Sequence, residues 1–291
     1  MKLHEDKILF ADIISRAAEH PSQGGLGIPP QFIEKDYWIT NALQNLAGSQ
    51  YGELAVFKGG TSLSKAYHIG MRFSEDIDIA IIHREKFSDA KLKTIIRATE
   101  KDMSKSQLCL RIDSFANPFP YHKMQIRSFV YDFLTMVIRH DLIKEFELSP
   151  FEINVLDKRT TMTEKLVALV RFSLAQNPIP ELEAKIRHFY DLYYLMEDAE
   201  CVEYLHSGEF RKNFAALLQH DKELFDHPLG WRNKPLCESP LLTDFKAVWK
   251  ELSPRYTAEL PSLSYSLTIP TPSQLETTLT PLFRHLSSIF C

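Results

Sequence analysis

The chain has 291 residues, of which 44% are hydrophobic and 25% charged, a balance typical of a globular protein and not of a disordered or fibrous one. Lysine and arginine number 34 against 38 acidic residues, a formal net charge of −4, so bulk charge does not indicate nucleic-acid binding. No stretch of 18 apolar residues and no signal-peptide pattern is present, which predicts a protein that is neither secreted nor membrane-spanning. The dispersed cysteines argue against a disulfide framework and a structural zinc site and favour a reducing cytoplasm: Cys109, Cys201, Cys237 and Cys291.

The first 82 residues alternate between helical and extended patterns. Apolar residues at near-helical spacing predict a helix over Pro30–Leu46. A short apolar run, Leu54–Phe57, predicts a strand that ends at the turn Gly59–Gly60. A short helix over Ser62–His68 and a strand over Asp76–Ile82, where carboxylates alternate with isoleucines, follow.

Residues 84–144 differ from the rest of the chain in charge. They hold 12 lysines and arginines against 7 acids, a local charge of +5, so the remainder carries −9. This asymmetry is a weak indication of a face that binds a polyanion, and a solvated helix surface is the commoner origin of such a run.

Helical patterns dominate after residue 150. The sequence FEINVLDK predicts a last strand, and Thr161 and Glu164 have the spacing of a capping box, which predicts that a helix begins near them. Pro281 is expected to kink or restart the amphipathic C-terminal segment. We therefore predict a mixed α/β domain over residues 1–157 and an all-helical domain over residues 158–291. The further helices are expected at residues 181–197, 209–220 and 240–260.

Two aspartates carry the clearest chemical signal. Asp76 and Asp78 are two residues apart on a predicted strand, which places both carboxylates on one face, about 6.5 Å apart at the backbone. Adjacent carboxylates repel unless a cation lies between them, and oxygen ligands on a rigid strand suit Mg²⁺ or Mn²⁺. The plain alternative is a solvated edge strand, but the intervening isoleucines require one buried face, so metal binding is favoured.

The glycine pair precedes the aspartates in a suggestive order. Gly59 and Gly60 let backbone N–H groups approach a phosphate without obstruction from a side chain. Neither a Walker A loop nor a GxGxxG pattern is present. The order strand, GG, helix and then DxD, with 15 residues between Gly60 and Asp76, resembles the nucleotidyltransferase superfamily of the DNA polymerase β type. In that superfamily the glycine element holds the nucleoside triphosphate and the aspartates hold two metal ions.

Longer motifs narrow the resemblance to one family. The segments IEKDYW, KGGTSLSKAY, RFSEDIDI, TEKLVALVRFS and RHFYDLYYL together resemble the AbiEii/AbiGii family of nucleotidyltransferase toxins of bacterial abortive-infection and type IV toxin–antitoxin systems. The resemblance covers about residues 30–195. It implies a polymerase β-like core with a mixed sheet and N-terminal helices, followed by a helical domain that completes the active-site cleft.

The resemblance also implies a role for each matching residue. Asp76 and Asp78 would hold the metal, Lys165 would reach over the nucleotide, and Asp191 is the late acidic position of the family. The nucleotide-binding set would be Lys58, Gly59, Gly60, Thr61, Lys65, Arg72 and Ser74. The superfamily also uses a third carboxylate on a later strand, for which Glu147 is our choice and Glu145 and Glu152 are the rivals.

Each assignment has a structural alternative. Lys58, Lys65 and Lys165 have the pattern of ordinary surface lysines, and Arg72 has Glu75 and Asp76 as possible ion-pair partners. Asp191 follows Arg187 by four residues, the spacing of an intrahelical ion pair. The tyrosines are expected to pack a helix interface and the histidines to be structural: Tyr190, Tyr193, Tyr194, His68, His83 and His188.

The implied reaction is attack of an acceptor hydroxyl on the α-phosphate of a nucleoside triphosphate, with release of pyrophosphate. Family membership points to the 3′ end of tRNA as the acceptor and to an antitoxin that need not bind the toxin. Two alternatives remain open, nucleotidylation of a protein side chain and a non-catalytic nucleotide-binding regulator. Transfer of the γ-phosphate ranks lowest because neither HRD nor DFG is present.

Overall fold

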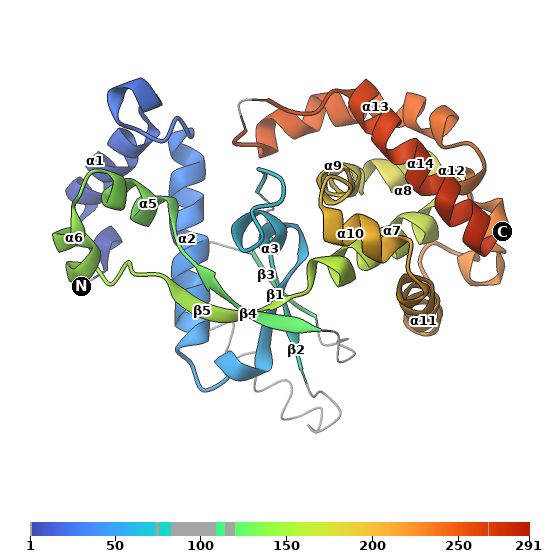
Figure 1. Cartoon of the computed structure of the whole chain (residues 1–291), viewed down its shortest axis with the longest axis horizontal. Helices are drawn as coiled ribbons and strands as arrows, with labels where there is room; N and C mark the ends of the chain where they lie inside the picture. Colours follow the sequence, from blue (N-terminus) through green and yellow to red (C-terminus); the bar gives the residue numbers. More distant parts are fainter. Residues whose placement is uncertain (1, 74–75, 83–108, 114–119, 267) are drawn as a thin grey trace. The chain divides into compact units, whose positions relative to one another are not determined.

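The computed structural model describes residues 2–73, 76–82, 109–113, 120–266 and 268–291 (Figure 1). Two compact units divide the chain, Met1–Asp157 and Lys158–Cys291. A mixed sheet lies in the first unit and the second is helical, which confirms the predicted fold class.

Helices alternate with strands in the first unit. The α-helices are α1 (Lys7–Ala18), α2 (Pro30–Ala47), α3 (Gly59–Lys65), α5 (Phe129–Met136) and α6 (His140–Glu145). The strands are β1 (Ala55–Lys58), β2 (Asp76–Ile81), β3 (Cys109–Asp113), β4 (Tyr121–Ile126) and β5 (Phe151–Leu156). Short 3₁₀ helices are η1 (Leu3–Glu5), η2 (Pro21–Gln23) and η3 (Gly52–Leu54).

The sheet has the strand order β3-β2-β1-β5-β4. Central strand β1 is antiparallel to β2 and parallel to β5, while β2 and β3 are parallel and β4 and β5 antiparallel. The register pairs Lys58 with Asp78 and Phe57 with Val155. The carboxyl ends of β1 and β5 therefore lie at the same edge of the sheet as the amino end of β2.

Helix α2 separates the sheet from the small helices of the first unit (Figure 1). It contacts α1, α5 and β5. Ile33 and Tyr37 join the apolar core formed with α1, α5 and α6. Helix α3 packs instead on β1 and β2. The helix that carries IEKDYW and the helix that begins at the glycine pair thus belong to neighbouring layers.

The second unit is built from helices around aromatic side chains. Phe189, Phe245, Trp249 and Phe283 have ring centroids between 4.7 and 6.4 Å apart and are buried. Its α-helices are α7 (Lys158–Ser173), α8 (Pro178–Glu183), α9 (Ile186–Leu195), α10 (Ala199–Leu205), α11 (Gly208–Leu224), α12 (Pro240–Thr243), α13 (Phe245–Leu263) and α14 (Pro272–Phe290). Two 3₁₀ helices, η5 (Trp231–Asn233) and η6 (Leu236–Glu238), complete it.

The helix boundaries expected from the sequence were wrong at four places. The helix expected over Ser62–His68 is α3, Gly59–Lys65, and the helix expected over residues 240–260 is two helices, α12 and α13, separated by Asp244. Helix α7 begins at Lys158, three residues before Thr161, which is buried inside the helix and does not cap it. The helix expected over residues 181–197 is two helices, α8 and α9, with a break at Ala184–Lys185. Pro281 lies inside α14, so the helix does not restart there. No helix among the described residues is long and apolar enough to cross a membrane.

Candidate active site

The junction between β1 and α3 brings the glycine pair against the DxD strand. Lys58 ends β1 with an extended backbone and lies directly opposite Asp78 in the antiparallel register. Gly59 follows with φ +82°, a conformation that favours glycine. A Cβ built on Gly59 would overlap the Asp78 carboxylate. The absence of a side chain at Gly59 is therefore what allows Asp78 to occupy its position.

Helix α3 is buried along most of its length. Gly60 and the four residues after it are shielded from solvent, and Thr61 is only 1% exposed. The hydroxyl of Ser62 donates to the Gly59 carbonyl (2.8 Å), and that of Ser64 donates to the Thr61 carbonyl (3.2 Å). Both serine hydroxyls therefore bond to backbone carbonyls of α3 itself.

The DxD strand is in place, although only part of the motif is described. Asp76 begins β2, opposite Cys109 in the register with β3, and its side chain lies outside the described part of the structure. Ser74, predicted to contact phosphate, is also outside the described residues. The described side chains contain no group of three or more His, Cys, Asp or Glu suited to a metal ion.

Two predicted phosphate ligands are buried among protein groups. The Arg72 side chain is 4% exposed, and its Nη1 donates to the Phe73 carbonyl (3.3 Å). The Lys65 ammonium lies 2.5 Å from Asp36 Oδ1 and 2.8 Å from the Arg127 carbonyl. The structure thus gives Lys65 two acceptors from the protein itself.

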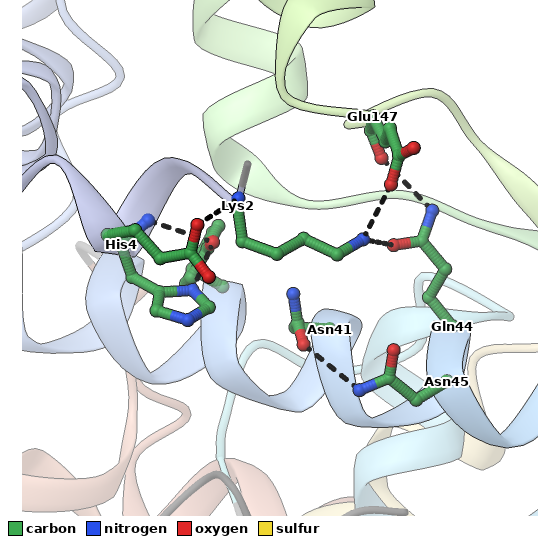
Figure 2. A network of polar contacts seen from close by, with 8 residues as sticks. Lys2, His4, Asn41, Gln44, Asn45 and Glu147 are labelled. Atoms are coloured by element: carbon green, nitrogen blue, oxygen red, sulfur yellow. Dashed lines mark hydrogen bonds and ion pairs between the residues drawn. The ribbon is translucent and has the colours of Figure 1, made fainter.

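The preferred third carboxylate, Glu147, lies in a different environment (Figure 2). Its carboxylate accepts a hydrogen bond from Lys2 Nζ (3.1 Å), which lowers the Glu147 pKa, and its side chain is 71% exposed. The Glu147 backbone carbonyl accepts a bond from Gln44 Nε2, and Lys2 also reaches Gln44 Oε1. Glu147 has φ +55° and joins the N-terminal segment to the end of α2.

The two alternative carboxylates, Glu145 and Glu152, do not lie at the glycine turn either. Glu145 is exposed on α6, and Glu152 is exposed at the start of β5. Because Val56 pairs with Asn154, Glu152 falls opposite Leu54, about 13 Å along the strands from Lys58. Asp157, which the sequence analysis passed over, directly follows β5 at the edge where Gly59 follows β1. It is 4% exposed and lies 3.0 Å from His122 Nε2.

Lys165 of α7 and Asp191 of α9 form a buried ion pair in the second unit. The distance from Nζ to Oδ2 is 2.6 Å, and the side chains are 6% and 4% exposed. The two residues that the resemblance singles out in this half of the chain are therefore in direct contact. Arg187, the alternative partner of Asp191, pairs with Glu259 at 3.7 Å.

The tyrosines after Asp191 pack against one another. The Tyr190 and Tyr194 rings are 4.9 Å apart, and the Tyr193 and Tyr194 rings 5.2 Å apart at 87°. Burial, together with the neighbouring Tyr190 hydroxyl, raises the pKa of Tyr194. These contacts agree with the expected packing role.

The basic segment is only partly described, because residues 83–108 lie outside the described ranges. In the part that follows, Lys123 pairs with Glu53, Arg127 with Asp132 and Arg139 with Asp141, each at 2.8 Å. The described part of the segment therefore has much of its positive charge balanced by neighbouring carboxylates.

Comparisons with known proteins agree with this geometry. The family model described as the nucleotidyl transferase AbiEii toxin of a type IV toxin–antitoxin system matches residues 41–278. Among solved structures, the nucleotidyltransferase toxin MenT4 of Mycobacterium tuberculosis shares the fold with a TM-score of 0.52 at 15% identity, over 96% of this chain and 89% of that one. No curated protein sequence matches the chain. The match over most of its length shows that the chain belongs to the AbiEii family of type IV toxin–antitoxin systems and is a nucleotidyltransferase.

Proposed function

We propose that this toxin transfers a nucleoside monophosphate from a nucleoside triphosphate to the 3′ end of tRNA in a reaction that requires a divalent metal ion. The observation that carries the proposal is the contact between Asp78 and Gly59, where a carboxylate and a side-chain-free turn share one edge of the sheet. A triphosphate bound at this turn would meet backbone N–H groups and the carboxylate of Asp78, which could hold a divalent cation.

The residues present suit Mg²⁺ or Mn²⁺. The donor set of Asp76 and Asp78 is made of oxygen atoms on one strand, which is the chemistry these ions prefer. Glycine at position 59 keeps the approach to Asp78 open. When bound, the metal would neutralise phosphate charge and acidify the acceptor hydroxyl. Asp157 lies at the same edge of the sheet and is the candidate for a third carboxylate in place of Glu147.

The chain's own groups bind and orient the triphosphate in this proposal. Gly59, Gly60 and Thr61 present backbone N–H groups, while Lys58 and Arg72, with Ser74, supply contacts to phosphate oxygens. Fixed donors of this kind stabilise the charge that develops on the leaving pyrophosphate without reorganising during the reaction. No covalent enzyme intermediate is required.

The second unit contributes Lys165 and Asp191. An ammonium held 2.6 Å from a buried carboxylate has a fixed position, which suits a group that must meet a phosphate in one geometry. We propose that Lys165 contacts the nucleotide and that Asp191 orients it.

The direct test is incubation of the purified protein with Mg²⁺, total bacterial tRNA and each α-³²P-labelled triphosphate in turn. We expect label on tRNA from the native protein, and none from the double variant Asp76→Asn/Asp78→Asn or after addition of EDTA. Label on protein would transfer the proposal to a side-chain acceptor. Triphosphate binding without label on either acceptor would contradict the enzyme mechanism and favour a nucleotide-binding regulator.

The proposed function also has consequences for the antitoxin and for the location of the protein in the cell. Toxins of type IV systems are paired with an antitoxin, and we propose that this antitoxin acts without binding the chain stably. A tRNA acceptor also places the protein in the cytoplasm. Co-purification of the two proteins from cells that express both would contradict the first expectation.

A further inference from the structure

A buried polar cluster joins α2 to the end of α3. Asp36 of α2 and Lys65, the last residue of α3, face each other with side chains that are 3% and 5% exposed. Asp36 belongs to IEKDYW and Lys65 to KGGTSLSKAY, two motifs that lie far apart in the sequence. The proposed reaction gives the first of these motifs no role.

Both oxygens of Asp36 are used, each toward a different element. Oδ1 lies 2.5 Å from Lys65 Nζ, and Oδ2 accepts a hydrogen bond from the backbone N–H of Phe129 (2.8 Å), the first residue of α5. Lys65 Nζ also donates to the Arg127 carbonyl (2.8 Å), two residues before α5. One carboxylate therefore holds the end of α3 and the start of α5 together.

These bonds fix α3 at the end opposite to the glycine turn. Helix α3 has seven residues, with Gly59 against Asp78 at its start and Lys65 against Asp36 at its end. A charged pair withdrawn from water persists only with good geometry and further hydrogen bonds, and both conditions are met. The residues between Lys65 and the glycine turn are buried in one short helix, so we expect a displacement at Lys65 to reach the turn.

We propose that Asp36 and Lys65 are positioning residues that set the place of the Gly59–Gly60 turn relative to Asp78, an inference that rests on the proposed function of that turn. Lys65 then acts through α3 and not by touching phosphate. Asp36 extends the functional set to α2, which the DxD and glycine motifs do not include.

The test is a double-mutant cycle on the full chain. Asp36→Asn, Lys65→Met and their combination are compared with the native protein for the KM of the triphosphate and for kcat in tRNA labelling. We expect each single change to lower kcat/KM by roughly 10- to 100-fold, mainly through KM, since a small misplacement of binding groups has effects of that order. The double variant is expected within about threefold of the singles, because both changes break the same pair. Lys65→Arg, which keeps a cation and its donors, should retain part of the kcat/KM that Lys65→Met loses.

Tyr37→Phe is the matched control. Tyr37 is the neighbour of Asp36 on α2 and is equally buried, but its hydroxyl bonds to His4 Nδ1 (2.8 Å) on the side of the N-terminal segment. We expect this variant to lower the thermal unfolding midpoint and to leave KM within twofold of the native value.

Additive losses would mean that Lys65 acts independently of Asp36, as a direct phosphate ligand would, and would overturn the proposal. A normal KM in Asp36→Asn would overturn it as well. If the single variants do not fold, the double variant carries the test, because it leaves no unpaired buried charge, and a native KM there would also overturn the proposal. If the native protein labels no acceptor, the proposed function fails. Equilibrium dialysis of Mg²⁺-triphosphate against the same variants then judges the positioning role alone, and unchanged affinity overturns it.

Discussion

A single missing side chain controls the geometry of the candidate active site. Gly59 has a positive φ and stands so close to Asp78 that a Cβ would overlap its carboxylate. Two independent reasons therefore require glycine here, one in the backbone and one in the neighbouring strand. At Gly24 only the backbone requires glycine, since φ is +88° there and nothing lies within 4 Å of a Cβ at that position.

Gly59→Ala is expected to lower nucleotidyl transfer by roughly 100-fold, because the Asp78 carboxylate must move. Its cost in unfolding free energy from backbone strain is about 1–2 kcal/mol. Gly24→Ala has a similar strain and no collision, so it should lose similar stability while transferring nucleotide normally. Urea unfolding and tRNA labelling measure the two effects, and equal activity in the two variants would contradict the argument.

The buried pair Lys165 and Asp191 allows stability and activity to be separated. Lys165→Met alone leaves a buried carboxylate without its partner, with a cost of about 3–5 kcal/mol. Lys165→Met/Asp191→Leu removes both charges and should recover much of that stability without recovering transfer. Recovery of transfer in the double variant would show that the pair is only structural.

A control pair lies in the same unit. Arg171 of α7 and Asp221 of α11 are 2.8 Å apart with side chains 12% and 13% exposed. Arg171→Met should lose stability and retain nucleotidyl transfer once the protein is folded. Loss of transfer in folded Arg171→Met would mean that any buried charge change in this unit disables the enzyme.

At the scale of elements, α2 links the N-terminal segment to the sheet. Tyr37 packs against His4, Phe10 and Trp38, and burial raises the pKa of its hydroxyl to about 12. The unfolded chain loses this proton near pH 10. The contribution of the protonated Tyr37 hydroxyl to the unfolding free energy is therefore complete below about pH 10, and it is lost as the pH rises toward 12.

The native protein is expected to lose about 1 kcal/mol more unfolding free energy than Tyr37→Phe between pH 9 and pH 11. One pKa unit corresponds to about 1.4 kcal/mol, and partial solvent screening reduces it. Denaturant unfolding of both proteins at the two pH values measures the difference. Parallel pH dependences would show that Tyr37 titrates as in the unfolded chain.

Elements with strong local signals could be predicted from the sequence. The helix over Pro30–Leu46 and the strand over Asp76–Ile82 are confirmed to within one residue at each end. Strands β3 and β4 were not predicted, because Tyr121–Ile126 is mostly exposed and has no clear alternation of apolar residues. The start of α7 was placed too late because the pattern of its threonines resembles that of capping residues. They are buried inside the helix instead, and the Thr163 hydroxyl donates to the Arg159 carbonyl.

The candidate site could be proposed from the sequence where its chemistry depends on the order of motifs along the chain. The resemblance supplied Lys165 and Asp191, and only the fold shows that they touch. The candidate third acid, Asp157, could not be proposed from the sequence, because its position depends on the register of β5 against β1, which brings Asp157 to the glycine edge and leaves Glu152 at the other. The Asp36 and Lys65 pair is likewise a product of helix packing.

At the scale of the whole molecule, charge is unevenly distributed between a basic segment and an acidic remainder. Lysines and arginines that neutralise phosphates release counterions, so RNA binding weakens as salt is added. Lys123, Arg127 and Arg139 already have carboxylate partners, so the proposed tRNA contact is expected to depend on the other cations of the segment.

Charge reversal at Lys91, Lys93 and Arg97, three residues outside the described ranges, is expected to weaken tRNA binding and to reduce the slope of log K against log salt by about 2. Filter binding at several salt concentrations measures this slope. Lys123→Glu is the control, since Lys123 is already paired with Glu53. An unchanged slope in the triple variant would exclude this segment as the RNA-binding face.

The contacts of two consecutive residues, Asp36 and Tyr37, also restrict where residues can be inserted into or deleted from the chain. One α-helical residue corresponds to a rotation of 100°, and these neighbours engage different parts of the first unit. A one-residue insertion or deletion between them would turn one contact away while the other stayed in place. Insertions and deletions should therefore be excluded from the middle of α2, whereas they should be better tolerated at Gly24, which is solvent-exposed and has nothing within 4 Å of a Cβ.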